Sequence, residues 1–322
     1  MTGIPDRFGR RIDYLRLSVT DRCNLRCIYC MPPEGVTHMP HSEILSYEEI
    51  HFIACAAAEL GINKIRLTGG EPLVRADLAK LVKMLSEIEG IQELSLTTNG
   101  TSLKKYAPDL KKAGLTRVNV SLDTLKADRF QYITRLGKLD DVLEGIEAAR
   151  RAGLEPIKIN TVVMRGINDD EILDFARMTY QDGWHIRFIE LMPFNGIGQP
   201  VPSLELLQHI GLLGKLEPCQ PTAGNGPARY YRLAGAKGTI GFISPLSEPA
   251  FCTRCNRIRL TSDGRLRPCL LGENEIDLKR ALRNGASTED IKRLILKAIS
   301  SKPKGHRLGK DMTKRSMSQI GG

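Results

Sequence analysis

The sequence predicts an α/β fold in which parallel strands form a partly open barrel. Three observations lead to this prediction: short apolar segments recur with helical segments between them, glycines stand where those helices should end, and polar residues alternate along the strands. The chain has 322 residues, of which 41% are apolar and 26% charged. It is therefore long enough for one large domain or two ordinary ones, with a sizeable core.

Six short apolar segments are the predicted strands, and each precedes a segment with helical periodicity. Their starts lie roughly 24 to 50 residues apart, a spacing that suits strand–helix units. Six such units predict a parallel sheet with right-handed crossovers. The predicted strands span residues 14–20, 64–70, 93–100, 117–123, 156–163 and 185–192.

The ends of the predicted helices carry recognisable signals. Ser46 and Glu49 have the spacing of a capping box at a helix start. Glycines stand at positions where helices should stop, because a glycine readily takes the left-handed conformation that ends a helix. These are Gly61, Gly90, Gly114 and Gly153.

Polar residues recur at every second position of the predicted strands. Strands covered on both faces of an open sheet usually read as continuous apolar runs. One polar face in strand after strand favours a partly open barrel with a polar lumen over a doubly wound sheet. Cations in that lumen would be costly to bury alone, so they need an anionic ligand or internal pairing with Glu71, Asp123 or Glu190. The polar pairs are Arg16 and Ser18, Arg66 and Thr68, Ser95 and Thr97, Asn119 and Ser121, Lys158 and Asn160, and His185 and Arg187.

The pattern changes after residue 195, so we divide the chain into a barrel region, 1–195, and a smaller C-terminal α+β region, 196–322. Gly- and Pro-rich loops dominate the start of the second region. Short strands are predicted at residues 229–234 and 238–244, and helices at 277–285 and 289–300.

Composition limits the location and the partners. The longest mainly apolar run is far shorter than the ~20 residues that span a bilayer, and the first residues have no apolar stretch of the secretory type. We expect a cytoplasmic protein with no membrane partner. The net charge of +10 permits a nucleic acid or a nucleotide phosphate as partner. The basic segment 292–315 is interpreted as a solvated tail.

Eight cysteines in a reducing compartment are more often metal ligands or catalytic groups than disulfides. Cys55 and Cys219 are interpreted as structural. The other six form two groups of three: Cys23, Cys27 and Cys30, then Cys252, Cys255 and Cys269.

The first triad follows the first strand, at the end of a parallel barrel where active sites lie. A structural zinc site needs four ligands, and no fourth cysteine or histidine follows at close spacing. Three thiolates on a [4Fe–4S] cluster would leave one iron open. The spacing allows one short loop to bind three corners of such a cluster.

This CxxxCxxC loop, with Tyr29 just before the third cysteine, resembles the signature of the radical S-adenosylmethionine (SAM) enzymes. Residues 67–72, LTGGEP, resemble the GGEP motif of that superfamily, which holds the amino group of SAM. The resemblance implies a partial (βα)6 TIM-type barrel, with SAM on the open iron of a [4Fe–4S] cluster. It also implies cleavage of SAM to a 5′-deoxyadenosyl radical that abstracts a hydrogen atom. The SAM contacts implied are Tyr29, Gly70, Ser121 and Met192.

The second triad surrounds a predicted hairpin. Two residues separate Cys252 from Cys255, and thirteen separate Cys255 from Cys269. Asp263-Gly264 as a two-residue turn would set Leu260 opposite Arg267 and Ile258 opposite Cys269, returning Cys269 to within a few residues of Cys255.

A CxxC–x13–C triad beside Arg-x-Arg, downstream of such a barrel, resembles the family of molybdenum cofactor biosynthesis protein A, the GTP 3′,8-cyclases. The resemblance spans the chain and includes the terminal Gly321-Gly322. It implies a second [4Fe–4S] cluster facing guanine, hydrogen abstraction from C3′ of GTP and attack of C3′ on C8, the first step of molybdenum cofactor (molybdopterin) biosynthesis. No side chain is assigned as catalytic. The GTP contacts implied are Arg16, Arg66, Thr97, Lys158, Arg257, Ile258 and Arg259, with Lys64 and Arg187 as neighbours.

The same resemblance implies a reductant as electron donor, a homodimer, and transfer of the product to molybdenum cofactor biosynthesis protein C. It implies no nucleic-acid partner. Gly321-Gly322 is either a frayed end or a tail that reaches into the pocket toward Arg257 or Arg259.

Two other functions fit parts of the sequence. One is another radical SAM enzyme with an auxiliary cluster, for example one acting on a peptide. The other is a zinc-containing nucleic-acid-binding protein, suggested by the net charge and the two cysteine groups. Against the second, the basic residues are interleaved with barrel strands and do not follow one helix.

Overall fold

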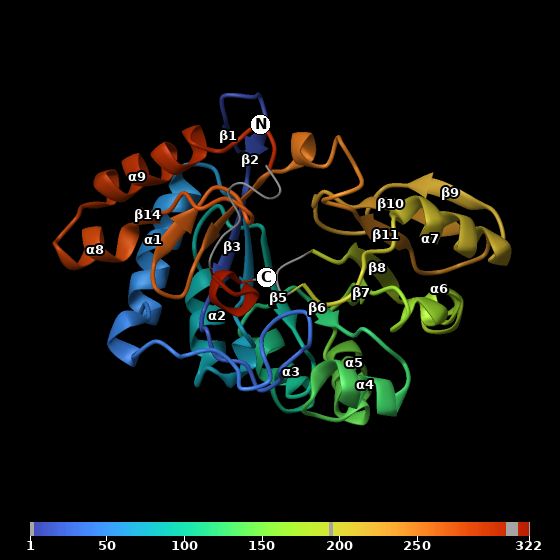
Figure 1. Ribbon diagram of the computed structural model, residues 1–322. Helices are drawn as coiled ribbons and strands as arrows, with labels where there is room; N and C mark the ends of the chain where they lie inside the picture. Colours follow the sequence, from blue (N-terminus) through green and yellow to red (C-terminus); the bar gives the residue numbers. More distant parts are fainter. Residues whose placement is uncertain (1–2, 193–195, 307–314, 322) are drawn as a thin grey trace.

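A computed structural model describes residues 3–192, 196–306 and 315–321, and it contains one curved, mainly parallel sheet (Figure 1). The six predicted strands form its centre in chain order, each parallel to the next. The fold class predicted from the sequence is therefore confirmed. These strands are β3 (Tyr14–Ser18), β4 (Lys64–Thr68), β5 (Glu93–Thr98), β6 (Arg117–Ser121), β7 (Lys158–Val163) and β8 (His185–Glu190). A small ribbon of β1 (Ile4–Pro5) and β2 (Arg11–Ile12) precedes them.

Helices follow each central strand and form an outer arc around the strands (Figure 1). They are α1 (Tyr47–Glu59), α2 (Leu78–Ser86), α3 (Leu103–Lys112), α4 (Ala127–Thr134), α5 (Leu139–Arg151), α6 (Ile172–Gln181) and α7 (Ser203–Ile210). The capping box predicted at α1 is present: the Ser46 hydroxyl accepts from Glu49 N at 3.1 Å, and the Glu49 carboxylate accepts from Ser46 N at 2.8 Å. The four glycines predicted at helix ends have positive φ.

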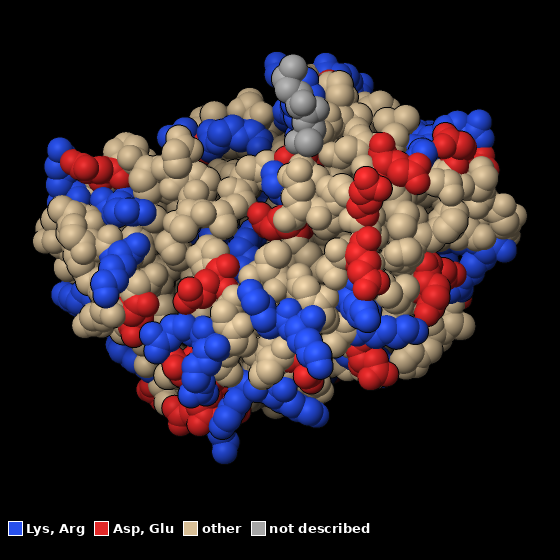
Figure 2. Space-filling model, turned by 180° about the vertical axis from the view of Figure 1, so that it is seen from behind, with Lys and Arg blue, Asp and Glu red and all other residues tan. Residues whose placement is uncertain are grey.

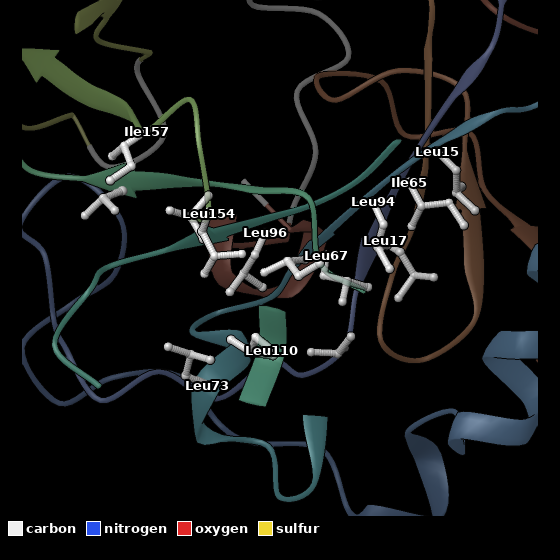
Figure 3. Close-up of a cluster of buried hydrophobic side chains, with 14 of the residues drawn as sticks. Leu15, Leu17, Ile65, Leu67, Leu73, Leu94, Leu96, Leu110, Leu154 and Ile157 are labelled. Atoms are coloured by element: carbon white, nitrogen blue, oxygen red, sulfur yellow. The ribbon is translucent and has the colours of Figure 1, made fainter. Parts of the chain in front are cut away.

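The apolar alternate residues of the strands face the helices. Leu15, Leu17, Ile65 and Leu67 are fully or almost fully buried in the main core, and Figure 3 shows them gathered with Leu94 and Leu96. Because side chains alternate between the two faces of a strand, this packing directs the polar alternates to the inner, concave side of the sheet.

The C-terminal region extends the same sheet at both edges. Beside β8 lie β11 (Ile240–Ile243), which is parallel to it, then β10 (Arg229–Leu233) and β9 (Leu216–Cys219). Beside β3 lie β12 (Arg257–Leu260), also parallel, then β13 (Arg265–Arg267) and β14 (Ile276–Asp277). The curved parallel part thus runs from β12 through β3–β8 to β11. The boundary suggested at residue 195 falls in residues 193–195, outside the described part.

Two further helices on this side are α8 (Leu278–Arg283) and α9 (Thr288–Ser300), and α9 packs against α1. The short helix α10 (Met317–Ile320) lies inside the arc of strands, close to the described end of the chain (Figure 1).

The predicted register of the β12–β13 hairpin is wrong by one residue. Arg259 lies opposite Arg267 and Leu260 opposite Leu266, because the loop contains three residues, 262–264, with Thr261 N bonded to Arg265 O at 2.9 Å. Gly264 closes this loop with φ +77°, a conformation that favours glycine.

Within the described residues, no helix combines the length and the apolar character needed to cross a membrane. On the face seen in Figure 2, Lys and Arg side chains are interspersed with Asp and Glu.

Candidate active site

A cavity on the concave side of the sheet brings the predicted site residues together. Both cysteine triads line it, as do all the predicted SAM contacts and all but one of the predicted GTP contacts. The exception is Ile258, whose side chain is fully buried in the main core on the other face of β12. Of the two predicted neighbours, Arg187 lines the cavity, whereas Lys64 is paired with Asp13 at 2.9 Å.

The triads lie at opposite ends of this cavity. Cys23 and its partners follow the carboxyl end of β3, whereas Cys252 and Cys255 precede the amino end of β12, which is parallel to β3. Cys269 follows β13, which runs antiparallel to β12 and so returns to the same end. Because β3 has five residues, about 15 Å of strand separates the two ends.

The first cysteine loop is fastened to α4. Ile28 N donates to Ile133 O at 2.9 Å, and Arg26 N donates to Thr134 O at 3.0 Å. Within the loop, Cys30 N donates to Cys27 O at 2.9 Å. Burial raises the pKa of Cys23 to about 11 and that of Cys30 to about 12. Thiolates here therefore need a compensating cation, which the iron of a cluster supplies.

Gly70 of the GGEP segment lies against the chain that leads into this loop. A β-carbon at Gly70 would stand 2.3 Å from Arg22 O, so no larger residue fits without a backbone shift. Glu71 N donates to Arg22 O at 2.8 Å. The Glu71 carboxylate accepts from Thr98 Oγ1 at 2.7 Å and from Asn99 N at 2.6 Å, while burial raises its pKa to about 7. The segment thus braces the cysteine loop against the end of β5.

The carboxylates considered for pairing with lumen cations bond elsewhere. Glu71 makes the contacts just described. Asp123 accepts from Tyr29 Oη at 2.7 Å and from Val162 N at 2.8 Å. Glu190 accepts from the backbone of residues 246 and 247. Among the described residues, none of the three forms an ion pair with a lumen Lys or Arg, so internal pairing with them does not neutralise the lumen.

Three lumen cations, Arg66, Arg187 and Lys158, contact neutral groups, whereas Arg117 is ion-paired with Glu93. Arg66 Nε donates to Ser95 Oγ at 3.2 Å, and its guanidinium lies 5.2 Å from the centre of the Tyr14 ring. Arg187 Nη2 donates to Asn119 Oδ1 at 2.9 Å. Lys158 lies over Tyr230 at 5.3 Å and donates to the Ala223 carbonyl.

Burial and mutual repulsion lower the pKa values of these groups. Burial, followed by the charges of Arg187, Arg117 and Arg66, lowers the pKa of Lys158 to about 6. Burial also lowers the pKa of Arg66 to about 10. Several cavity-lining atoms, including Asn160 Oδ1 and Arg187 Nε, have no hydrogen-bond partner in the described structure. Several positive charges close together, and polar atoms without a hydrogen-bond partner, favour binding of a polyanionic ligand.

The second cysteine triad has a different electrostatic environment. Cys255 N donates to Cys252 O at 3.2 Å across a single 3₁₀ turn. Burial alone would raise the pKa of Cys255, but Arg257 and Lys302 lower it to about 6. His306 Nδ1 lies 3.2 Å from Cys252 Sγ. The thiolate form is thus favoured at Cys255, whereas burial raises the pKa of Cys252; thiolates are the usual ligands of iron–sulfur clusters. In the described part of the chain, no group of three His, Cys, Asp or Glu side chains suits a single metal ion.

The C-terminal segment enters the cavity. Met317 and Ser318 line it, and Gly321 O accepts from Arg259 Nη1 at 2.8 Å. A β-carbon at Gly321 would stand 2.5 Å from Thr68 Oγ1, at φ +70°. The expectation of a tail reaching Arg259 is confirmed for Gly321; Gly322 lies outside the described residues.

Residues 292–315 are not simply a solvated tail. Lys302 is 2% exposed, and Arg315 forms ion pairs with Asp263 and Glu275. Sequence reasoning missed Lys302 because it has no local pattern. It also missed Arg117, which lines the cavity, although Arg117 shares the alternation of Asn119 and Ser121.

Comparisons with known proteins agree with this geometry. The profile of the radical SAM superfamily matches residues 17–179, and that of Molybdenum Cofactor Synthesis C matches residues 184–308. GTP 3′,8-cyclase of Pelotomaculum thermopropionicum is 54% identical over 326 residues, covering 99% of this chain and 100% of that protein. GTP 3′,8-cyclase of Moorella thermoacetica is 52% identical over 324 residues, covering 99% and 100%.

A solved structure shares the fold. Streptococcus suis SuiB bound to precursor peptide SuiA superposes with a TM-score of 0.60 and 15% identity, covering 87% of this chain and 66% of that one. At this identity the likeness concerns the fold alone.

The curved parallel sheet, with a CxxxCxxC loop at the carboxyl end of β3, defines a radical SAM protein. Within that superfamily, the chain belongs to the GTP 3′,8-cyclase family, since it is more than half identical to such proteins over nearly the whole of both chains.

Proposed function

We infer that this protein is a GTP 3′,8-cyclase, the radical SAM enzyme of the first step of molybdenum cofactor biosynthesis. The observation that carries the inference is one cavity with a cysteine triad at each end and a basic lumen between them. That arrangement has room for SAM at the first triad and for a nucleotide triphosphate between the two.

The first triad would hold a [4Fe–4S] cluster, and the neighbouring residues would position SAM. With SAM bound, the cluster supplies the electron that cleaves the sulfonium bond and yields the 5′-deoxyadenosyl radical. Tyr29, Gly70, Ser121 and Met192 surround the place where SAM would lie. The Tyr29–Asp123 hydrogen bond fixes the ring at the third cysteine.

The lumen residues would bind and orient GTP. Arg16, Arg66 and Lys158 offer positive charge to the triphosphate, and guanidinium groups match pairs of phosphate oxygens. Arg259 is in register with Arg16 and Arg66, and Arg257 lies two residues nearer the second triad on β12; both would contact GTP. Cys252, Cys255 and Cys269 would hold a second [4Fe–4S] cluster that binds guanine. Orientation of C3′ toward the radical and of C8 toward C3′ is then the contribution of the protein.

The wider setting is part of the same proposal and rests on the family. It comprises an external one-electron reductant, a homodimer, a cytoplasmic location and transfer of the product to molybdenum cofactor biosynthesis protein C. The likeness to SuiB does not support a peptide substrate, since it concerns the fold alone. Membership of the radical SAM superfamily disfavours the zinc-containing nucleic-acid-binding alternative.

Anaerobic turnover tests this function. Reconstituted protein with SAM, dithionite and GTP should yield 5′-deoxyadenosine together with a cyclised GTP product, and ATP in place of GTP should not. Equal amounts of 5′-deoxyadenosine with and without GTP, and no cyclised nucleotide, would contradict the assignment.

A further inference from the structure

The segment that follows α9 crosses the second cysteine triad. Lys302 is 2% exposed, and its ammonium donates to Arg257 O at 2.8 Å and to Pro268 O at 2.7 Å. Arg257 lies two residues after Cys255, and Pro268 immediately precedes Cys269. One buried cation therefore connects the two chain segments that carry these cysteines.

Lys302 makes these hydrogen bonds just beyond the last residue pair of the β12–β13 hairpin. The last pair of β12 and β13 toward the triad is Arg259 with Arg267. Pro268 follows, and a proline has no N–H to donate to the neighbouring strand. The two cysteine-bearing segments leave the ladder at this point, and Lys302 supplies the hydrogen bonds that the ladder no longer makes.

The third cysteine is tied to the same segment through Arg10. Arg10 Nη1 donates to Cys252 O at 3.0 Å and to Lys304 O at 3.1 Å, and Nη2 donates to Pro303 O at 2.7 Å. Asp6 holds the guanidinium in place with an ion pair at 2.6 Å. All three cysteines of the triad are thus attached to residues 302–304.

We propose that Lys302 is the positioning residue of the second triad: its ammonium sets the separation of the Cys255 and Cys269 segments so that three thiolates can hold an iron–sulfur cluster. The inference rests on the proposed function for the presence of that cluster. A buried ammonium near Cys255 also offsets part of the negative charge of its thiolate, which an uncharged side chain could not do. Outer contacts of this kind orient the ligands of metal sites, and their loss typically costs about 10- to 100-fold in metal affinity.

Lys302→Met tests this role, because methionine fills similar space without charge or donors. Iron is measured per chain after anaerobic reconstitution, and the reduced clusters are examined by Mössbauer and paramagnetic resonance spectroscopy. Wild-type protein should contain about eight irons and the variant about four, while cleavage of SAM in the absence of GTP persists. Lys297→Met, at an exposed position of α9, should match the wild type.

Each outcome decides the matter. Selective loss of the second cluster supports the role of Lys302. Retention of both clusters overturns it, and so does loss of both, because the effect would then not be local to the second triad. A wild-type protein with a single cluster would instead refute the second cluster of the proposed function.

Arg10→Gln covers the case in which Lys302→Met does not fold. This variant should assemble both clusters but release iron from the second to a chelator at least about tenfold faster than wild type, giving biphasic loss. Wild-type release rates in Arg10→Gln would contradict a role for residues 302–304 in holding the triad.

Discussion

Lys158 is the lumen residue whose charge depends most directly on a ligand. Its amine is buried on β7 and surrounded by Arg187, Arg117 and Arg66, so its pKa falls to about 6. In the ligand-free protein it is therefore mostly neutral at pH 7.5. A bound triphosphate would favour the ammonium and return the pKa toward its usual value.

Binding of GTP should consequently take up a proton at Lys158. The protonated form binds better, so affinity should be highest near pH 6 and fall as the pH rises, by up to about tenfold per pH unit between 7.5 and 8.5. Calorimetry in two buffers of different ionisation enthalpy counts the protons. Lys158→Met should bind more weakly and lose the proton uptake; the same uptake in both proteins would contradict this assignment.

Lumen residues could be predicted where a local sequence pattern places them on one face of a strand. Arg16, Arg66 and Lys158 were predicted because alternation along a strand places them on one face. Arg117 follows the same alternation at the start of the predicted strand 117–123, and was missed because only Asn119 and Ser121 were taken as the polar pair of that strand. Lys302 could not be predicted, since its partners are backbone carbonyls about 30 to 45 residues away.

At the scale of single elements, α10 is held in the cavity by an ion-pair cluster at its start. Arg315 makes two hydrogen bonds to Asp263, at 3.1 and 2.9 Å, and one to Glu275 at 2.9 Å. Asp263 belongs to the loop of the β12–β13 hairpin, at the end opposite to the second triad. The same hairpin therefore carries two arginines of the lumen and anchors the tail that meets one of them.

Arg315→Met should release this tail. Hydrogen bonds between charged groups contribute about 1.5–3 kcal/mol each, so amide exchange of residues 315–321 should accelerate at least about tenfold. Mass spectrometry of peptic fragments measures it. Arg283→Met, which removes an ion pair with Glu49 on α1, should leave the tail protected; equal protection in both variants would show that Arg315 is not the anchor.

The second cysteine triad is a separate element-scale test. Cys269→Ser should retain the first cluster, with about four irons per chain, and should still cleave SAM, but it should form no cyclised nucleotide. Cys219→Ser, on β9 and outside the cavity lining, is the matched control and should keep full activity. Full activity in Cys269→Ser would mean that the second triad is not needed for the reaction.

Secondary-structure elements could be predicted from the sequence where a short segment of the chain determines them. The six central strands, the capping box and the helix-ending glycines follow from short segments. The hairpin register did not, because a two-residue and a three-residue loop both fit Asp263-Gly264 and differ by one position.

Across the whole molecule, the important feature is a sheet completed by distant strands. Arg257 on β12 pairs with Tyr14 on β3, and Ile240 on β11 pairs with Ile186 on β8. Pairings over such sequence distances leave no local pattern, so the sequence could not show that the C-terminal region completes both sides of the cavity. This closure brings the two triads to opposite ends of one lumen.

The positions of the two triads predict which hydrogen atom the radical abstracts. In the proposed function, SAM would lie at the carboxyl end and guanine at the amino end, which would leave the ribose of GTP between them, facing the radical. The hydrogen atom should therefore leave from the ribose, and no hydrogen of guanine should be removed by the radical.

GTP deuterated at C3′ tests this most directly. In a single anaerobic turnover with SAM and dithionite, mass spectrometry should find one deuterium in 5′-deoxyadenosine and none at that position in the cyclised product. Unlabelled 5′-deoxyadenosine formed alongside a product that retains its deuterium would contradict the account.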